Sequence, residues 1–417
     1  MSKHIVIIGG GVIGLNVAYY SLLRGLRVTV LERSPEQRDG CSFGNAGMIV
    51  PSHVVPLAAP GMVALGLKWM WNPESPFYIQ PRLSTDLLKW SWHFWRACSA
   101  SHVRRSGPLL RDLHLASRAL YEELSDAWSN EFGLERRGLL MLCQTQQALD
   151  EEAHAAELAR GLGIPAEVHD AAGTAALDPV VNMDVCGSVY FPRDCHLTPQ
   201  RFMSSLLRRV LELGGNVCWE TEVTGFDIRG RRVAAVKSNR DEIAADEIVI
   251  AGGSWSPLVA RWLSLNLPMQ AGKGYSLTLP RPRQLPQICS ILSEARVAVT
   301  PMGSSLRFGG TMEMSGLNED INPVRVRGII KSARRYFPEF RDEDFDGITP
   351  SRGLRPCSPD GLPYIGRTNR CENLTIATGH AMLGLSLGPI TGKLVSQILN
   401  REPTDIDLSL LSPDRYA

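Results

Sequence analysis

The first 32 residues pass from an apolar run to a glycine-rich break and back to an apolar run. Residues 5–8 are β-branched and of strand length, and three consecutive glycines follow at once. Apolar positions over 15–22 recur with helical spacing and stop near Gly25. A second β-branched run over 27–31 closes on Glu32. The pattern predicts a strand, a tight turn, a helix and a second strand that ends in an acid.

Two later segments repeat the combination of an apolar run and glycine. Residues 247–256 contain a predicted buried strand that ends in paired glycines, and residues 373–380 contain another strand. A glycine-rich loop over 381–384 and a helical pattern over 390–399 follow the second strand. A nucleotide site that returns to the end of the chain implies a long ligand lying across a domain made of separate segments.

The middle of the chain mixes strand and helix patterns, which predicts an α/β protein with a second, α+β region. Strands are expected over 138–142, 188–191, 216–221 and 296–300, and helices over 111–124 and 199–213.

The glycine spacing of the first turn matches the needs of a dinucleotide. In Gly9-x-Gly11-x-x-Gly14 the first glycine makes the turn, the second lets a pyrophosphate approach, and the third lets the helix pack on the strand. The helix N-terminus offers free N–H groups to the phosphates. Glu32 is placed to accept hydrogen bonds from a ribose diol, and its charge disfavours NADP. The unit alone does not separate FAD from NAD.

Composition narrows the class of protein. A length of 417 residues suggests more than one domain, and 44% hydrophobic with 21% charged residues is typical of a globular protein with a large core. A formal net charge of +1 disfavours nucleic acid as a partner. No apolar run reaches the roughly 18 residues of a transmembrane helix. The glycines also interrupt the apolar start that a signal peptide would need.

The nine cysteines are scattered and contain neither a C-x-x-C pair nor a zinc-ligand spacing. They are expected to be reduced thiols in a cytosolic-type compartment, and no metal site is expected. The sequence therefore favours a cytoplasmic location.

Five of the nine tryptophans fall in one stretch, at Trp69, Trp71, Trp90, Trp92 and Trp95. Basic residues accompany them at Lys68, Lys89, Arg96, Arg104 and Arg105. Aromatic side chains beside basic ones can seat a protein on a membrane surface, here the inner face of the membrane. The alternative, which the sequence favours, is that these rings fill the core of the second domain or a subunit contact. The oligomeric state is not predicted.

Taken in order, the motifs resemble the D-amino acid oxidase superfamily of flavoproteins, and most closely its bacterial D-amino acid dehydrogenases, with a D-hydroxyproline dehydrogenase as one option. The resemblance covers nearly the whole chain. Besides the first glycine turn it is carried by Cys41-Ser-Phe-Gly-Asn-Ala-Gly47, Lys68-Trp-Met-Trp71, Gly274-Tyr-Ser-Leu-Thr278, Gly309-Gly-Thr-Met-Glu313, Gly353-Leu-Arg-Pro356, Pro359-Asp-Gly361 and Thr378-Gly-His-Ala-Met-Leu-Gly384.

The resemblance implies FAD in an extended pose and a discontinuous Rossmann-type FAD-binding domain over 1–60, 193–256 and 345–417. An α+β substrate-binding domain over 61–192 and 257–344 is expected to roof the flavin. Some relatives attach the flavin to a cysteine, but the matching position here is Gly353 and not Cys357. Non-covalent FAD is therefore expected.

The resemblance also implies the residues that bind FAD. The loop from Ser42 to Met48 is expected beside the flavin ring and ribityl chain, and the backbone of Val223 at the adenine. The loop before the last helix is expected to stabilise the reduced flavin, with His380 at the flavin edge and not in proton transfer. The full set is Gly9, Gly11, Val12, Ile13, Gly14, Glu32, Arg33, Ser42, Asn45, Ala46, Gly47, Met48, Val223, Gly252, Gly253, Trp255, Arg355, Gly379, His380, Met382, Leu383, Gly384 and Leu385.

Amine oxidation by flavin transfers the α-hydrogen as a hydride to flavin N5, so the protein must hold the substrate carboxylate with a cation. Arg355 is the expected clamp, since a guanidinium can fork onto a carboxylate, and Arg352 could compete with it. Tyr275 resembles a substrate-site tyrosine, although a core tyrosine with a satisfied hydroxyl is nearly as well supported. No protein base is proposed.

The expected function is an FAD-dependent dehydrogenase that oxidises a small D-amino acid, such as D-proline or cis-4-hydroxy-D-proline, to the imine. The alternative is a glycine- or sarcosine-type oxidase that passes electrons to oxygen. A flavin subunit that only relays electrons is a third reading, which the Arg355 clamp argues against. The acceptor, a quinone or another carrier, is left open.

Overall fold

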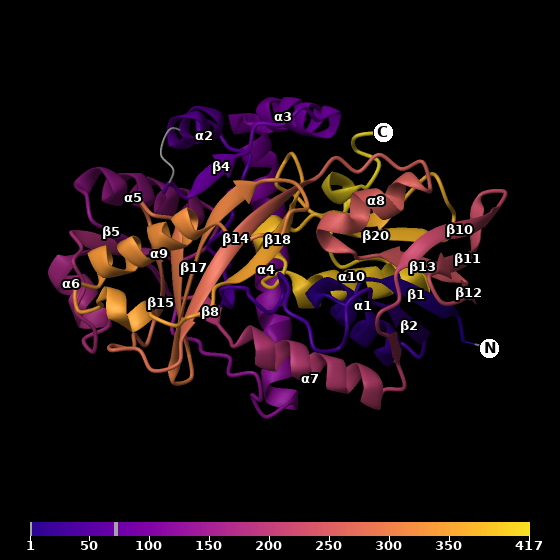
Figure 1. Ribbon diagram of the computed structural model, residues 1–417, viewed down its shortest axis with the longest axis horizontal. Coiled ribbons are helices and arrows are strands. Elements are labelled where there is room, and N and C mark those ends of the chain that lie inside the picture. Colours follow the sequence, from indigo (N-terminus) through magenta and orange to yellow (C-terminus); the bar gives the residue numbers. More distant parts are fainter. Residues whose placement is uncertain (1, 71–73) are drawn as a thin grey trace.

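The computed structural model describes residues 2–70 and 74–417, and a six-stranded sheet organises one half of the molecule (Figure 1). The strand order is β19-β20-β13-β1-β2-β9, and β1 pairs in parallel with both β2 and β13. The start and the middle of the chain therefore meet in this sheet. Its strands are β1 (His4–Ile8), β2 (Arg27–Leu31), β9 (Asn216–Cys218), β13 (Glu247–Ile250), β19 (Tyr364–Arg367) and β20 (Leu374–Thr378).

The apolar run of β1 is continuous because both faces of the strand are buried. Ile5 and Ile7 belong to a hydrophobic cluster with α1 (Val12–Leu23), α7 (Pro199–Glu212) and α10 (Gly388–Asn400). Val6 and Ile8 point the other way, into a cluster with a three-stranded sheet and the region of α8. These further elements are β10 (Val223–Arg229), β11 (Arg232–Ser238), β12 (Glu242–Ala244) and α8 (Ser256–Arg261).

Helices α1 and α10 cross at a distance that leaves no room for a side chain at Gly392. A Cβ added there would lie 2.6 Å from the backbone carbon and oxygen of Asn16. The Asn16 side chain is fully buried and donates from Nδ2 to the Val12 carbonyl at 2.8 Å. Since α1 carries the glycine turn at its start, this contact fixes the position of the turn on the sheet.

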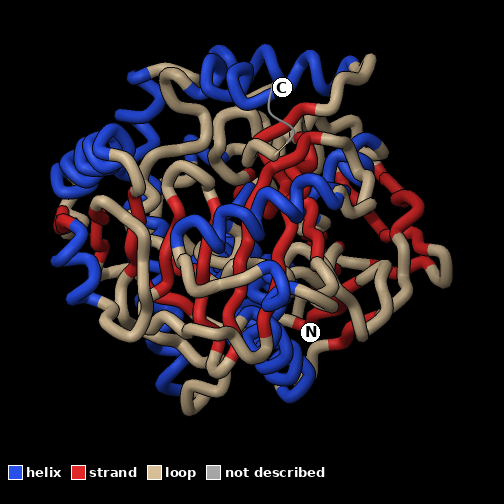
Figure 2. The backbone as a smooth tube through the Cα atoms, turned by 60° about the vertical axis from the view of Figure 1, so that its left-hand side comes forward, coloured by secondary structure: helices blue, strands red, loops and turns tan. Residues whose placement is uncertain are grey.

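The other half of the molecule is built on a nine-stranded, mostly antiparallel sheet of order β18-β14-β17-β16-β15-β5-β7-β6, with β4 paired to β17. In Figure 2 the strands run through the middle of the molecule and helices lie outside them. The strands are β4 (Phe77–Ile79), β5 (Leu139–Cys143), β6 (Glu167–Asp170), β7 (Gly187–Phe191), β14 (Gln270–Leu279), β15 (Cys289–Leu292), β16 (Val297–Met302), β17 (Ser305–Met314) and β18 (Ser351–Cys357).

Helices cover this sheet and link it to the first. Helix α9 packs on β14, β16 and β17 through one hydrophobic cluster, and α5 packs on β5 and β7 through another. The long helix α4 contacts α10, and α2 and α3 lie at the top of Figure 1. The helices are α2 (Met62–Met70), α3 (Thr85–Ala97), α4 (Ala100–Ala127), α5 (Gln146–Gly161), α6 (Ala171–Leu177) and α9 (Pro323–Tyr336).

The remaining elements of the fold are short. A two-stranded pairing joins β3 (Met48–Ile49) to β8 (Cys195–His196). The 3₁₀ turns are η1 (Gly253–Trp255), η2 (Asp342–Phe345), η3 (Ala381–Leu383) and η4 (Ser409–Leu411).

The predicted strands and helices are confirmed, with two differences in length. The helix expected over 111–124 is longer, since α4 runs from Ala100 to Ala127. The strand expected over 216–221 ends at Cys218, after which the chain turns and the Thr221 N–H donates to the Glu32 carbonyl at 2.9 Å. The domain boundaries stay a prediction, and we note that β18, within the predicted 345–417 segment, pairs with β14 in the second sheet.

Three further observations concern the chemistry of the chain. All nine cysteines lie in the described part and are free thiols. Within residues 2–70 and 74–417, no helix is both long and apolar enough to cross a bilayer. The same residues contain no group of three or more His, Cys, Asp or Glu side chains that could hold a metal ion.

The packing of α1 on α10 predicts the effect of one added methyl group. Gly392→Ala should destabilise the protein by about 1–3 kcal/mol, because the new Cβ overlaps the Asn16 backbone. The matched control is Gly161→Ala in α5, whose Cβ would meet nothing within 4 Å and which should be neutral or slightly stabilising. Urea unfolding of the full chain measures both free energies. Equal stability of the two variants would contradict the close packing.

Candidate active site

Two adjoining cavities lie where the two sheets meet. The first, of about 670 Å³, contains the glycine turn and is called the glycine-turn cavity here. The second, of about 640 Å³, lies against the nine-stranded sheet and is called the Arg355 cavity. Both are lined by Cys41, Asn45, Arg352, Gly353 and Ala381, so they share a wall and together form one extended space.

The glycine turn opens the N-terminus of α1 toward the first cavity. Gly9 adopts φ +111°, and a Cβ there would lie 2.6 Å from the Ala251 carbonyl oxygen. Gly11 is the N-cap of α1, and a Cβ there would make only an ordinary contact, with Ser42 Oγ at 3.5 Å. Val12 and Ile13 line the same cavity, and the Val12 N–H donates to Ser42 Oγ at 3.0 Å. A helix N-terminus whose N-cap residue makes no side-chain cap hydrogen bond favours an anionic group such as a pyrophosphate.

Glu32 lines the glycine-turn cavity at the end of β2. Its Oε2 accepts from the Gly10 N–H at 2.7 Å and its Oε1 from the Ser34 N–H at 2.9 Å. Each carboxylate oxygen keeps a further lone pair that a hydroxyl could use. The carboxylate is thus held in place and can still accept two hydrogen bonds from a diol.

Segments far apart in the chain complete the far end of this cavity. The Arg33 guanidinium lies 3.7 Å from the centre of the Trp255 ring, a cation–π contact between the segment after β2 and η1. Val223, Gly252 and Gly253 line the cavity beside them. The structure therefore brings these five residues, all predicted to bind FAD and among them Val223 predicted at the adenine, to one cavity.

The loop after Cys41 crosses from one cavity to the other. Ser42 lines the glycine-turn cavity, Ala46 and Met48 line the Arg355 cavity, and Asn45 lines both. The loop is held from β17 by Arg307, which the sequence did not single out. The Arg307 Nη1 donates to the Asn45 carbonyl at 2.7 Å and to the Phe43 carbonyl at 3.0 Å. Burial lowers the pKa of Arg307 to about 10, which leaves it charged at neutral pH.

The loop before α10 also contacts both cavities. Gly384 and Leu385 line the glycine-turn cavity, and Met382 and Leu383 line the Arg355 cavity. His380 lines the glycine-turn cavity, where its Nε2 is 3.0 Å from Thr391 Oγ1. Burial lowers the pKa of His380 to about 3, so the ring is neutral, and its Nδ1 has no partner among the described residues.

Three predicted glycines line neither cavity. A Cβ at Gly14 would lie 1.9 Å from the Gly9 carbonyl oxygen, and one at Gly47 would lie 2.3 Å from the Leu197 carbonyl oxygen. A Cβ at Gly379 would lie 2.7 Å from the Tyr364 ring. Because these three glycines lack a side chain, the neighbouring backbone and the Tyr364 ring can pack closely around the site.

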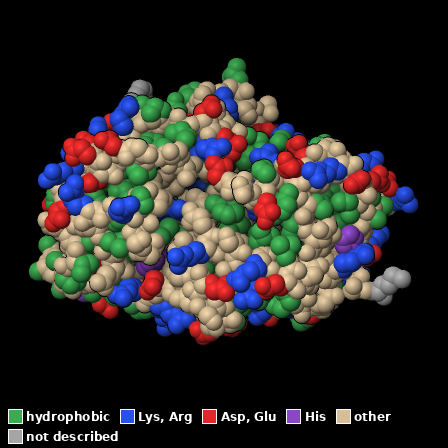
Figure 3. Space-filling view, turned by 60° about the horizontal axis from the view of Figure 1, so that its bottom comes forward, with side chains coloured by type: hydrophobic (Ala, Val, Ile, Leu, Met, Phe, Trp, Pro, Cys, Tyr) green, Lys and Arg blue, Asp and Glu red, His purple; other side chains and the backbone are tan. Residues whose placement is uncertain are grey.

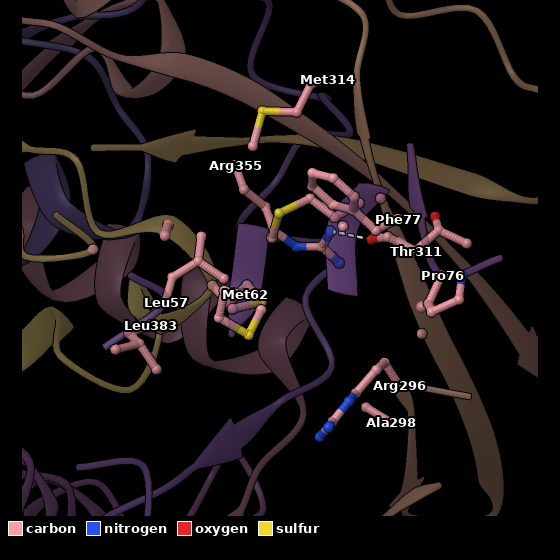
Figure 4. A pocket seen from close by; sticks show the side chains of 18 of the residues that line it. Leu57, Met62, Pro76, Phe77, Arg296, Ala298, Thr311, Met314, Arg355 and Leu383 are labelled. Atoms are coloured by element: carbon pink, nitrogen blue, oxygen red, sulfur yellow. Dashed lines mark hydrogen bonds between the residues drawn. The ribbon is translucent and has the colours of Figure 1, made fainter. Parts of the chain in front are cut away.

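Arg355 presents a guanidinium to the second cavity (Figure 4). The group lies directly over Gly274 on the neighbouring strand, where a Cβ would come within 2.2 to 2.4 Å of it. Its Nη1 donates to the Thr311 carbonyl at 2.6 Å, and Thr311 reaches this position with an unusual φ of +66°. No described residue forms an ion pair with Arg355, so its charge is available to a ligand.

Unlike the Arg355 guanidinium, the charged group of Arg352 and the hydroxyl of Tyr275 each have a carboxylate partner in the protein. Arg352 forms an ion pair with Asp39 and donates from Nε to the Glu319 carbonyl at 3.0 Å. Tyr275 lines the Arg355 cavity and also belongs to the cluster beneath α9. Its hydroxyl donates to Glu313 Oε2 at 3.0 Å and accepts from the Asn322 N–H at 3.2 Å. A substrate role for Tyr275 stays a prediction. Because its hydroxyl is already hydrogen-bonded within the protein, the alternative of a core tyrosine is favoured.

The rest of the Arg355 cavity is mainly apolar, with Met62, Phe77 and Met314 among its lining residues (Figure 4). Three further residues of this wall, His53, Arg296 and Gly274, were not among the predicted site residues, although Gly274 begins one of the quoted motifs. His53 Nδ1 is 3.0 Å from Ser52 Oγ, which in turn donates to the buried Asp194 at 2.5 Å. No motif in the sequence marks His53 or Arg296, which lie at separate turns of the chain.

Known proteins resemble the chain over its whole length. The model of the DAO family, FAD dependent oxidoreductases, matches residues 4–398. A protein of Granulibacter bethesdensis named D-amino acid dehydrogenase is 31% identical over 418 residues, which covers 99% of each chain. A protein of the same name from Methylobacterium radiotolerans is 32% identical and covers 99% of this chain and 100% of its own length.

Solved structures share the fold. Glycine oxidase from Geobacillus kaustophilus superimposes with a TM-score of 0.79 at 22% identity over 100% of both chains. L-proline dehydrogenase from P. horikoshii gives a TM-score of 0.74 at 17% identity and covers 100% of this chain and 98% of its own. These likenesses confirm the α/β fold class. With a family model that spans nearly the full sequence and relatives above 30% identity, the chain belongs to the family of FAD-dependent oxidoreductases.

Proposed function

We propose that this protein is an FAD-dependent dehydrogenase that oxidises a D-amino acid to the imino acid, with Arg355 holding the substrate carboxylate. The observation that carries the proposal is the unpaired Arg355 guanidinium in a mainly apolar cavity that adjoins the glycine-turn cavity. The printed names of the full-length relatives support the same substrate class.

The described residues fit FAD. The N-terminus of α1 would take the pyrophosphate, Glu32 the ribose diol, and Val223 with Trp255 the adenine end. The loop after Cys41 and the loop before α10 would take the flavin end, where the unpartnered Nδ1 of His380 needs a donor or acceptor. When bound, FAD supplies the two-electron acceptor for the α-hydrogen of the amine. We propose the extended, non-covalent binding mode, since Gly353 stands where some relatives carry a cysteine.

The chain's own contribution is to bind and orient the amino acid. A guanidinium can hold a carboxylate through two parallel hydrogen bonds, which fixes the direction in which the α-carbon points. The hydrogen bond to the Thr311 carbonyl and the flat contact with Gly274 limit the rotation of Arg355. The apolar wall excludes water and so strengthens this charge pair. Within this class we retain the small and cyclic D-amino acids as the first substrates to test.

Removal of the clamp should weaken substrate binding. Arg355→Met is expected to raise the dissociation constant of the best D-amino acid about 10- to 100-fold, as for loss of a charge-assisted pair worth about 1.5–3 kcal/mol. Anaerobic titration of the flavin spectrum measures the constant. The control is Arg352→Met, which breaks the Asp39 pair and should leave the affinity nearly unchanged. The reverse result would make Arg352 the clamp.

A second prediction concerns Gly274, over which the Arg355 guanidinium lies. Gly274→Ala should lower kcat/KM about 100-fold, because its Cβ would displace the Arg355 guanidinium by a distance that disturbs the reacting geometry. Gly225→Ala in β10, where a Cβ meets nothing within 4 Å, is the matched strand control and should keep wild-type kcat/KM. Steady-state rates with a soluble dye acceptor give both values. An active Gly274→Ala enzyme would separate Arg355 from substrate binding.

The reaction class is tested by a substrate panel. We expect anaerobic flavin bleaching with D-alanine, D-proline or cis-4-hydroxy-D-proline, and no hydrogen peroxide in proportion to imine under air. Bleaching by glycine or sarcosine with one peroxide per imine would instead establish the oxidase alternative. Flavin that stays oxidised with every member of the panel would favour an electron relay without its own substrate.

A further inference from the structure

Helices α2 and α3 give the Arg355 cavity an aromatic wall. Trp69, Trp90 and Trp95 line it, while Trp71 lies outside the described residues. Trp90 is 2% exposed, whereas Trp92 and Trp95 are more than half exposed. None of the lining residues described on these two helices has an ionisable side chain. A group that exchanges a proton with a substrate in this cavity must therefore come from another wall.

The remaining walls carry six ionisable side chains within the described part of the chain, and none is a carboxylate: Cys41, His53, Tyr275, Arg296, Arg352 and Arg355. The arginines stay protonated and cannot accept a proton. Burial raises the pKa of Cys41 and of Tyr275. Burial and the charge of Arg296 lower the pKa of His53 to about 4, so its ring is neutral at neutral pH. His53 is therefore the lining side chain that offers a free acceptor for a proton.

His53 lies close to both loops that we propose for the flavin end. It follows the loop after Cys41, and the nearby Val50 N–H donates to Ser386 Oγ in the loop before α10 at 3.1 Å. His53 and Arg355 line the same cavity. An amino acid whose carboxylate is held by Arg355 would thus have His53 as the acceptor for its ammonium group.

The hydrogen bonds of His53 determine which ring nitrogen carries the proton. The Ser52 hydroxyl donates to Asp194 Oδ2 at 2.5 Å, so Ser52 Oγ can only accept from His53 Nδ1, which is 3.0 Å away. Nδ1 therefore carries the proton and Nε2 the lone pair. Nε2 has no hydrogen-bond partner among the described residues and is not one of their fully enclosed polar atoms, so its lone pair is open to the cavity that His53 lines. The other ionisable groups that face the ring are Arg296 and His114, whose pKa burial lowers to about 3.

Asp194 differs from the other buried acids of the protein. On the face shown in Figure 3, Asp and Glu side chains lie at the surface among Lys and Arg. Five acids of the described chain are buried, and Glu247, Glu313 and Asp360 each form an ion pair with a Lys or Arg. Asp178 and Asp194 form none. Of these two, only Asp194 is connected to a cavity through hydrogen-bonded side chains.

The surroundings of Asp194 allow it to gain and lose a proton near neutral pH. Burial raises its pKa to about 7, although the two hydrogen bonds from Ser52 and the charge of Arg118 on α4 act in the opposite direction. The Cys195 and Cys289 thiols also face Asp194, and burial raises the pKa of both, which keeps them uncharged. Asp194 is thus a buried carboxylate with hydroxyl and amide donors but no ion pair to hold it ionised.

We propose that His53, Ser52 and Asp194 form a proton relay, which accepts the ammonium proton of the substrate in the Arg355 cavity and delivers it to Asp194. The proton relay rests on the proposed function, since it serves the oxidation of an amine. No sequence motif indicates it, because Ser52 and Asp194 lie 142 positions apart in the chain.

The transfer moves one proton and leaves His53 neutral. The substrate N–H bond breaks as the Nε2–H bond of His53 forms, Nδ1 gives its proton to Ser52 Oγ, and the Ser52 hydroxyl proton passes to Asp194 Oδ2. Asp194 becomes a neutral carboxylic acid, and His53 is left in its other neutral tautomer. The substrate nitrogen now has an electron pair with which to form the C=N bond when the α-hydrogen leaves as a hydride, for which bound FAD is the acceptor.

The pH dependence of single-turnover flavin reduction tests the proton relay. In the anaerobic holoprotein with its best D-amino acid, the wild-type rate should rise with pH through about 7, since Asp194 accepts a proton only when ionised. His53→Gln and Ser52→Ala should each lower the rate about 100-fold at pH 7, the scale of general-base catalysis. The loss should shrink as the pH approaches the pKa of the substrate amine, because the substrate then binds deprotonated. Ser52→Thr keeps the hydroxyl and should keep the rate.

Asp178→Asn is the matched control, because it changes a buried acid that lines neither cavity, and its pH profile should match the wild type. A wild-type rate for His53→Gln at pH 7 would overturn the proton relay. So would a loss of the same size at every pH, which is expected if His53 and Ser52 only support the packing. Wild-type flavin that no D-amino acid reduces at any pH would refute the proposed function, and the proton relay with it.

Infrared spectroscopy of the substrate-free holoprotein tests Asp194 without turnover. A carboxylic-acid carbonyl band should disappear as the pH rises through about 7, and this change should be absent from Asp194→Asn and present in Asp178→Asn. Ser52→Ala removes a hydrogen bond that lowers the pKa of Asp194, so it should move the midpoint to higher pH. This second variant provides the test if Asp194→Asn does not fold. Identical titrations of the wild type and Ser52→Ala would exclude Asp194 as the proton acceptor.

Discussion

Strand β18 is the element on which the two halves of the site depend. It pairs with β14 over seven residues in the nine-stranded sheet, and its last residue, Cys357, bridges to His380 in the loop before α10. The Leu354 carbonyl also accepts from Ser254 Oγ at 2.9 Å, which ties the strand to η1. A single short strand therefore touches the sheet that carries Arg355, the adenine-side turn and the C-terminal loop. Because β18 contributes only backbone atoms to these contacts, they hold the two cavities next to each other without depending on the side chains of β18.

The positively charged side chains around the site differ in the polar groups that they contact within the protein. Burial of a charge costs several kcal/mol unless polar groups compensate for the lost water. Arg307 meets this cost with backbone carbonyls of the loop after Cys41, and Lys273 with Glu313, Asn318 and the Asp320 carbonyl. These two side chains hold loops in place. Arg355, with one backbone carbonyl and no carboxylate, keeps donors free on a cavity wall, and this difference supports its assignment to the substrate.

Features set by residues close together in the chain could be predicted from the sequence, and features set by distant partners could not. The unit from β1 to Glu32 was predicted in full, because its turn, its helix and its acid are separated by few residues and each obeys a local rule. Strands β14, β17 and β18 were not predicted as strands. Strands β14 and β17 carry buried polar side chains such as Gln270, Lys273, Arg307 and Glu313, which break the apolar pattern that marks a strand. Those polar residues are buried because they bind each other or distant loops, and a sequence pattern does not show such partners.

By itself the sequence determined the α/β class, the glycine turn with its acid, and the two segments that return to the same sheet, since backbone periodicity and glycine spacing are local properties. Only the tertiary structure decided which arginine of β18 has a free charge, because the Asp39 that pairs with Arg352 lies 313 positions away. It likewise decided that Tyr275 points beneath α9 and that Trp92 and Trp95 face outward while Trp90 is buried. The partners and the burial of these side chains are set by packing between distant segments. They therefore cannot be predicted from the residues that neighbour them in the chain.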